Sequence, residues 1–108
     1  FFSELYRVLE PGALAHIISP YGWSDGAITD PTHTRYLTIN TFTHSMNGNE
    51  DSGTFRYNTA CKFEIAGNPK YSVTQLFTHL LSDHEELMRA IQTRLNVVYD
   101  FYLALRKV

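Results

Sequence analysis

The stretch from residue 4 to residue 20 constrains the fold of this chain most, because it combines a helix, a tight turn and a strand. From Phe2 onward, apolar residues recur at helical spacing while polar residues occupy the other positions. This pattern predicts an amphipathic helix whose buried face would carry Phe2, Leu5, Tyr6 and Leu9. Pro11 cannot continue that helix, and Gly12 is free to adopt a positive φ, so the chain should turn sharply there. A helix–turn–strand unit of an α/β protein is therefore expected.

The strand after the turn is an apolar run rather than an alternation of apolar and polar residues. Residues 14–18 read Leu-Ala-His-Ile-Ile. Such a run suits a strand that helices cover on both faces, as in parallel sheets. We therefore expect residues 14–19 to form a buried strand.

Two later segments alternate with the period of a half-buried strand, at residues 54–66 and 96–106. Between them, apolar residues from Val73 onward keep roughly helical spacing, as one helix or as two pieces, with Ser82 and Asp83 able to cap a new helix near His84. We expect the two alternating segments to be antiparallel neighbours in one sheet with residues 14–19. The last strand should lie beside the first.

Three stretches resemble the class I S-adenosylmethionine (SAM)-dependent methyltransferases, of the type 11-like kind. Residues 7–13 read Arg-Val-Leu-Glu-Pro-Gly-Ala, where the family has Arg-Val-Leu-Lys-Pro-Gly-Gly before its fifth strand. Residues 30–35 read Asp-Pro-Thr-His-Thr-Arg, which is similar to an Asp-Pro-Thr-His-x-Arg sequence in several branches of this superfamily. In those branches a short helix containing Phe follows, and residues 38–42 would correspond to it here. Residues 96–107 resemble the last strand. Glu10 and Ala13 depart from the family pattern, and neither removes the turn.

The resemblance implies an α/β fold, the C-terminal half of a Rossmann-like methyltransferase sheet with an antiparallel terminal strand pair. Residues 1–108 would be the C-terminal portion of one methyltransferase domain whose N-terminal, SAM-binding half lies outside this sequence. None of the six glycines forms the Gly-x-Gly turn that binds a nucleotide after a strand. The parent enzyme would transfer a methyl group from SAM to a small-molecule or sugar-like acceptor, and this chain alone would be inactive.

The loop after the first strand carries the candidate site residues. Asp30 and His33 are three residues apart, in a loop at the carboxyl end of a strand, where α/β sheets bind ligands. They could orient or deprotonate the acceptor as catalytic residues. Alternatively, Asp30 forms a turn with the backbone of residues 31–32, and His33 stabilises the loop by hydrogen bonding.

Three neighbouring residues are candidates for binding the acceptor. Tyr21 and Trp23 follow the strand and could wall a pocket, although aromatic residues at such positions also serve packing. Arg35 could hold an anionic group or could lie in solvent. The residues that bind SAM are expected outside this chain.

Charge and hydropathy make several other functions unexpected. The formal net charge is -2, without a basic stripe, so nucleic-acid binding is not expected. No apolar span of about 18 residues predicts a membrane helix. The single cysteine, Cys61, cannot form an internal disulfide, which fits a cytoplasmic protein.

Histidine and serine spacing do not indicate other enzyme classes. His79 and His84 are five residues apart and do not share a helical face, so no metal site is expected. No Gly-x-Ser-x-Gly sequence indicates a serine hydrolase. The second hypothesis is a non-catalytic module, either a degenerate methyltransferase half or a partner-binding α/β domain that uses exposed aromatic residues.

Overall fold

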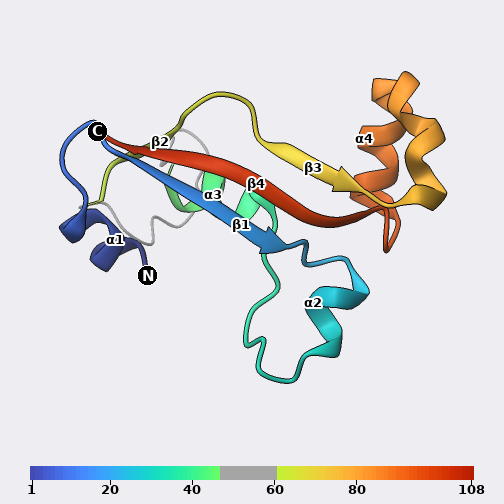
Figure 1. Cartoon of the computed structure of the whole chain (residues 1–108), viewed down its shortest axis with the longest axis horizontal. Coiled ribbons are helices and arrows are strands. Elements are labelled where there is room, and N and C mark those ends of the chain that lie inside the picture. The colour runs from blue at the N-terminus through green and yellow to red at the C-terminus, as the bar shows by residue number, and fades with distance from the viewer. Residues whose placement is uncertain (47–60) are drawn as a thin grey trace. The chain divides into compact units, whose positions relative to one another are not determined.

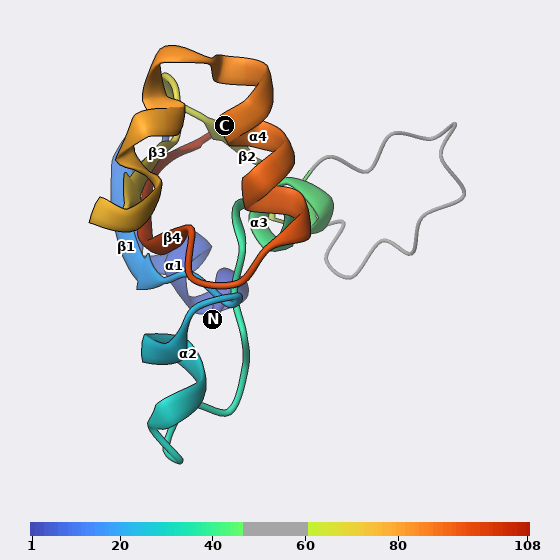
Figure 2. The same cartoon turned by 90° about the vertical axis from the view of Figure 1, so that its right-hand side faces the viewer.

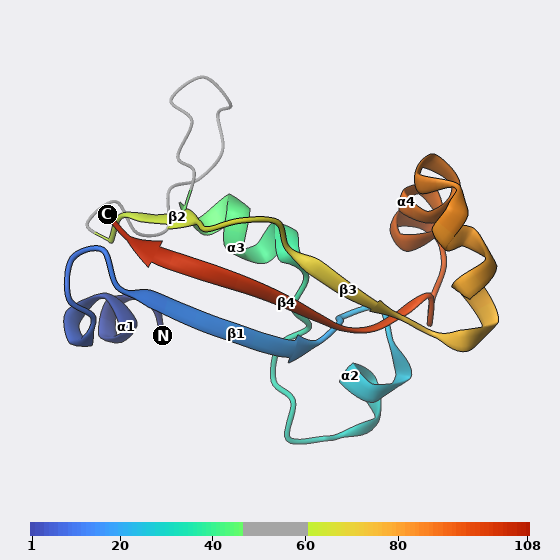
Figure 3. The same ribbon diagram turned by 45° about the horizontal axis from the view of Figure 1, so that its top comes forward.

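The computed structural model describes residues 1–46 and 61–108 as a mixed helix and strand fold with an open, four-stranded antiparallel sheet. The sheet order is β1–β4–β2, and β3 also pairs with β4 (Figure 3). The strands are β1 (Leu14–Pro20), β2 (Phe63–Ile65), β3 (Lys70–Val73) and β4 (Val98–Lys107). The predicted strand at 54–66 is thus represented by β2, and its residues 54–60 lie outside the described residues.

Strand β4 is antiparallel to its neighbours. The Lys107 N–H donates to the Ala13 carbonyl (3.1 Å), and the Tyr21 N–H donates to the Tyr99 carbonyl (3.0 Å), so the partners on β4 fall in number as those on β1 rise. Opposite β2, Phe63 pairs with Lys107 and Ile65 with Leu105. These pairings confirm that the last strand lies beside the first and is antiparallel to the segment that ends at residue 66.

The prediction that β1 is buried on both faces in a parallel arrangement is wrong for the described residues. Exposure alternates along the strand, and Ile18 keeps 73% of its surface exposed. The reason is that β1 lies at the end of the described sheet and pairs antiparallel with β4. One face of β1 is half-buried and the other carries exposed apolar residues, including Leu14.

The described residues divide into two compact units, and β1 and β4 contribute residues to both. The first unit comprises Phe1–Ile17, Ile39–Pro69 and Leu103–Val108, and the second comprises Ile18–Thr38 and Lys70–Tyr102.

In the first unit, aromatic side chains of two helices pack against β2. Helix α1 (Phe2–Val8) precedes β1, and α3 (Ile39–Met46) is the predicted short helix containing Phe (Figure 1). The Phe2 ring lies 5.8 Å from the Phe42 ring and 6.3 Å from the Phe63 ring, and the Tyr6 ring lies 5.4 Å from the Phe63 ring. These contacts confirm the predicted apolar face of α1.

The turn between α1 and β1 also has the predicted geometry. Gly12 has a φ of 83°, in the left-handed region that glycine adopts without steric cost, and its N–H donates to the Lys107 carbonyl (2.9 Å). The Lys107 ammonium donates to the carbonyls of Tyr6 (2.7 Å) and Leu9 (2.9 Å). Lys107 therefore satisfies carbonyls at the end of α1 that have no partner within the helix.

In the second unit, the helical region predicted from Val73 onward forms two pieces that contact each other (Figure 2). A 3-10 helix, η1 (Gln75–Ser82), is followed by α4 (His84–Thr93). The Asp83 carboxylate accepts from the Glu86 N–H (3.1 Å), so Asp83 caps α4 at the predicted position. The buried residues of the pair are Leu80, Leu87, Ala90 and Ile91.

Strand β3 was not predicted, and the predicted phase of β4 is wrong at its start. Alternation along residues 96–106 places Tyr99 with the buried Phe101, yet Tyr99 is exposed and Val98 is buried. The register of β3 on β4 shifts between Ser72 and Val73, opposite this part of β4. Such an irregularity reverses which face each side chain occupies.

Candidate functional site

The loop of residues 21–38, which carries all the candidate site residues, is closed at its base by the backbone. In the second unit, the Gly22 N–H donates to the Leu37 carbonyl (2.6 Å). A Cβ atom at position 22 would lie 3.0 Å from that carbonyl oxygen, which is tighter than most Cβ contacts and would require the backbone at Leu37 to shift. Glycine at position 22 thus allows the two ends of the loop to meet.

A short helix within the loop, α2 (Asp25–Thr29), was not predicted from the sequence. Asn96, at a φ of 60°, donates its N–H to the Trp23 carbonyl (2.9 Å) and accepts from the Asp25 N–H through Oδ1 (2.7 Å). Asparagine tolerates the left-handed region better than most residues, because its side chain can hydrogen-bond locally. Asn96 therefore positions the start of α2 from a distant part of the sequence.

Asp30 forms a turn with the residues that follow it. Its Oδ1 accepts from the Thr32 N–H (2.8 Å) and from the Thr32 hydroxyl (2.7 Å), and its carbonyl accepts from the His33 N–H (3.0 Å). The Thr32 hydroxyl, the Thr32 N–H and the nearby His33 hold the pKa of the Asp30 carboxyl below its ordinary value. Asp30 is thus a carboxylate whose Oδ1 is committed to the loop.

His33 connects this turn to α2. Its Nδ1 lies 3.0 Å from the Ala27 carbonyl oxygen, and its Nε2 lies 3.6 Å from Oδ2 of Asp30. The exposed fractions of the two side chains are 34% for His33 and 48% for Asp30. The structure therefore brings the two candidate catalytic residues together. It contains the loop-stabilising hydrogen bonds of the alternative interpretation, and both side chains remain accessible.

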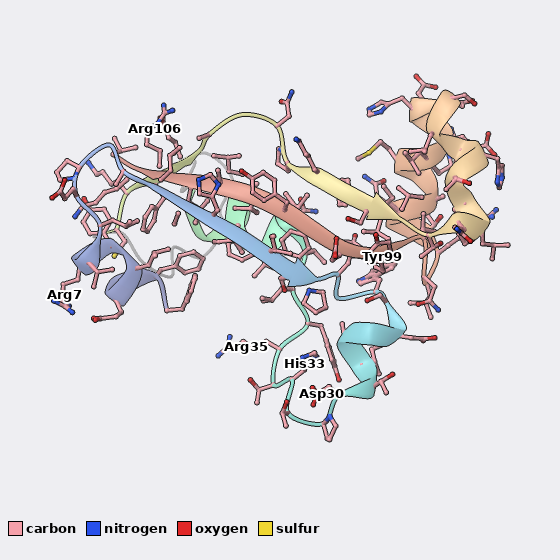
Figure 4. The ribbon with its side chains drawn as sticks, in the orientation of Figure 1. Arg7, Asp30, His33, Arg35, Tyr99 and Arg106 are labelled. Carbon is pink, nitrogen blue, oxygen red and sulfur yellow. The ribbon has the colours of Figure 1, made fainter. Side chains whose placement is uncertain are left out.

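The other three candidates, Tyr21, Trp23 and Arg35, differ in burial and in direction. Tyr21 is buried, its ring lies 5.9 Å from Tyr71 and 6.3 Å from Phe101, and burial raises the pKa of its phenol. Trp23 is partly exposed. The exposed Arg35 points away from the side of the loop on which Asp30 and His33 lie (Figure 4). Of the two aromatic candidates, Trp23 is therefore the one with the more accessible side chain.

No Gly-x-Gly sequence leads from a strand into a helix among the described residues, where Gly22 follows β1 and Gly26 lies within α2, four residues apart. The glycines with positive φ among them are Gly12 and Gly67, which lie in the turn before β1 and in the segment between β2 and β3. Neither begins a helix after a strand, the position at which a glycine-rich turn receives a nucleotide.

The described residues offer neither a candidate metal site nor a candidate membrane span. No group of three or more His, Cys, Asp or Glu side chains there could hold a metal ion. None of the described helices has the length and apolar character needed to cross a membrane.

Comparison of the chain with protein-family models, with curated proteins and with solved structures found no match.

The hydrogen bonds from Thr32 to the Asp30 carboxylate can be tested by substitution. Thr32→Val should raise the pKa of the Asp30 carboxyl toward its ordinary value of about 3.9, because the Thr32 hydroxyl is the largest cause of the lowering. A lowered folded-state pKa stabilises the loop above the ordinary value, and this contribution is lost as pH falls through the lowered value. Carbon-13 NMR titration of the carboxyl measures the change. Thr34→Val, the same substitution nearby, should leave the titration unchanged, and an equal shift in both variants would contradict the assignment.

Proposed function

We propose that this chain is the acceptor-binding part of a SAM-dependent methyltransferase that acts on a small-molecule or sugar-like acceptor. The observation that carries the proposal is the contact between Asp30 and His33. Both residues lie in the loop after β1, in a motif that resembles one found in those enzymes. The antiparallel β4, hydrogen-bonded between β1 and β2, supports it because the resemblance predicts this order.

The loop would hold the acceptor in position and take up a proton from it. Methyl transfer needs the acceptor atom aligned with the methyl group, so holding the acceptor supplies much of the rate. A base is needed where the acceptor loses a proton, and His33 is partly exposed beside a carboxylate. SAM, which would supply the methyl group, would be bound mainly by residues outside this chain.

A second candidate function is a non-catalytic partner-binding module. The observation in its favour is that three aromatic side chains of the second unit are exposed: Trp23, Tyr36 and Tyr99. Exposed aromatic residues are enriched where proteins bind one another. This function would require neither SAM nor an intact pairing of Asp30 with His33.

The experiment that tests the methyltransferase proposal is His33→Ala in the protein that joins this chain to a SAM-binding half. Turnover or acceptor affinity should fall, because the loop faces the acceptor. SAM affinity should stay within about threefold, a difference under roughly 0.7 kcal/mol. Steady-state kinetics with each substrate varied separately measures both quantities.

His79→Ala is the matched control, because His79 is an exposed histidine on η1, away from the loop. It should change neither quantity. Unchanged kinetics in His33→Ala, together with a lowered melting temperature, would contradict the catalytic role and support the loop-stabilising one.

A further inference from the structure

We infer that the phenol hydroxyls of Tyr21 and Tyr71 bind an uncharged oxygen of the acceptor, such as a hydroxyl of a sugar-like molecule. The inference deepens the proposed function, on which it rests, by adding Tyr71 to the acceptor-binding residues and by naming the class of group that they bind. It follows from the way in which the second unit packs the two rings and leaves their oxygens without a protein partner.

Tyr21 and Tyr71 approach each other from opposite sides of β4. Tyr21 directly follows β1, Tyr71 lies in β3, and both strands pair with β4 (Figure 3). Tyr71 is the register partner of Phe101, which has no exposed surface. The Tyr21 ring lies 5.9 Å from the Tyr71 ring and 6.3 Å from the Phe101 ring, with interplanar angles of 90° and 87°. This edge-to-face packing fixes the direction of both phenol C–O bonds.

The two phenol oxygens make no hydrogen bond with the described residues, although only 7% of the Tyr21 surface is exposed. A buried tyrosine usually finds a hydrogen-bond partner for its hydroxyl. Within residues 1–46 and 61–108, no fully enclosed side-chain oxygen lacks a partner, so both phenol oxygens reach the surface. Each ring is therefore packed in the protein while its hydroxyl is left for a ligand.

Both hydroxyls are neutral hydrogen-bond donors at neutral pH. Burial raises the pKa of Tyr21 and of Tyr71, and the neighbouring Tyr21 raises the pKa of Tyr71 further. Two uncharged donors bring no positive charge, so they do not offset the cost of removing the hydration of an anion. An uncharged oxygen with a lone pair, as in a hydroxyl, is the group that this pair of donors fits.

The pair lies where the sheet leads into the candidate-site loop. Tyr21 is the first residue after β1, and β3 runs in the same direction as β1, because both are antiparallel to β4. The carboxyl ends of strands are where α/β sheets bind ligands. Because packing already fixes the two rings, binding an acceptor would cost little further side-chain freedom. Tyr21 and Tyr71 are thus binding residues that orient the acceptor.

The first test removes each hydroxyl and measures stability. Tyr21→Phe and Tyr71→Phe should leave the urea midpoint of unfolding as in the natural chain, because no hydrogen bond within the protein is lost. Tyr99→Phe, at an exposed tyrosine of β4, is the matched control. A midpoint that falls in either variant but not in the control would overturn the inference, since the hydroxyl would then be held by the protein.

The second test is the binding of D-glucose, an uncharged sugar, to the full chain, followed through the tyrosine ring signals by carbon-13 NMR. The signals of Tyr21 and Tyr71 should shift to saturation, and that of Tyr99 should not. In Tyr71→Phe the dissociation constant should rise by about fivefold, as the loss of one hydrogen bond between uncharged groups implies. Sodium phosphate at the same concentrations should shift neither signal.

Absence of a saturating shift with glucose at Tyr21 and Tyr71 would overturn the inference. A saturating shift with phosphate at these residues would overturn the assignment of an uncharged ligand. None of these readouts requires a methyl donor, so their failure would leave the methyltransferase proposal standing. Failure of the chain's parent to bind SAM would remove the methyltransferase proposal and leave the glucose result unchanged.

Discussion

Leu103→Ala should lower the free energy of unfolding by about 3 kcal/mol, the typical cost of truncating a fully buried leucine and leaving a cavity. Leu103 lies in the middle of β4, has no exposed surface, and belongs to the core of the first unit together with Leu105 and Phe63. Neighbours fixed in a sheet cannot collapse into the space, so the cavity persists. Urea unfolding in dilute solution, followed by circular dichroism, measures the loss.

Leu76→Ala is the matched control, because it removes the same atoms from a leucine on η1 that is 77% exposed. It should change stability by no more than about 0.5 kcal/mol. Equal losses in the two variants would mean that β4 does not form the core of the sheet.

We expect that this chain alone binds no SAM and that it self-associates in solution. The described residues contain no Gly-x-Gly sequence between a strand and a helix, since Gly22 and Gly26, which follow β1, are four residues apart. Strand β1 lies at the edge of the described sheet and exposes Leu14 and Ile18. Exposed apolar edge strands favour pairing between copies. Calorimetric titration with SAM and size-exclusion chromatography measure both effects.

Ile18→Lys separates edge pairing from other association. A charge on an edge strand opposes pairing with another chain, so this variant should shift the chain toward monomer. Leu76→Lys, at an exposed leucine outside the sheet, should not. Micromolar SAM binding by a compact monomer of the natural chain would contradict the placement of the SAM site outside these residues.

Local signals predicted much of the fold. The spacing of Phe2, Leu5, Tyr6 and Leu9 predicted the apolar face of α1, which is half-buried rather than buried, and Gly12 adopts the positive φ that its turn requires. Asp83 caps α4 through a hydrogen bond to a residue three positions on. In each case the cause lies within a few residues, so the sequence pattern contains it.

The parts that were missed depend on residues far apart in the sequence. Strand β3 has four residues and is recognisable through its pairing with β4, and the shift at Ser72 and Val73 reverses the exposure of Val98 and Tyr99. The apolar run of β1 resembles a buried parallel strand, whereas its exposure depends on its position in the sheet. Short segments carry too little local information to decide such questions.

The candidate site shows the same division. Asp30 and His33 are close in sequence, and their contact follows from the turn that Asp30 makes with Thr32. The support that Asn96 gives to α2, and the closing of the loop at Gly22, join segments that no local pattern connects.

The proposed role of this chain is that of the acceptor-binding part of a SAM-dependent methyltransferase. The measurement that tests it most directly is the coding sequence upstream of residue 1. We predict a strand there that leads into a glycine-rich turn, with an acidic residue about 20 positions further on to hold the ribose hydroxyls. Upstream sequence that encodes no such strand, turn and acidic residue would contradict the claim and favour the partner-binding module.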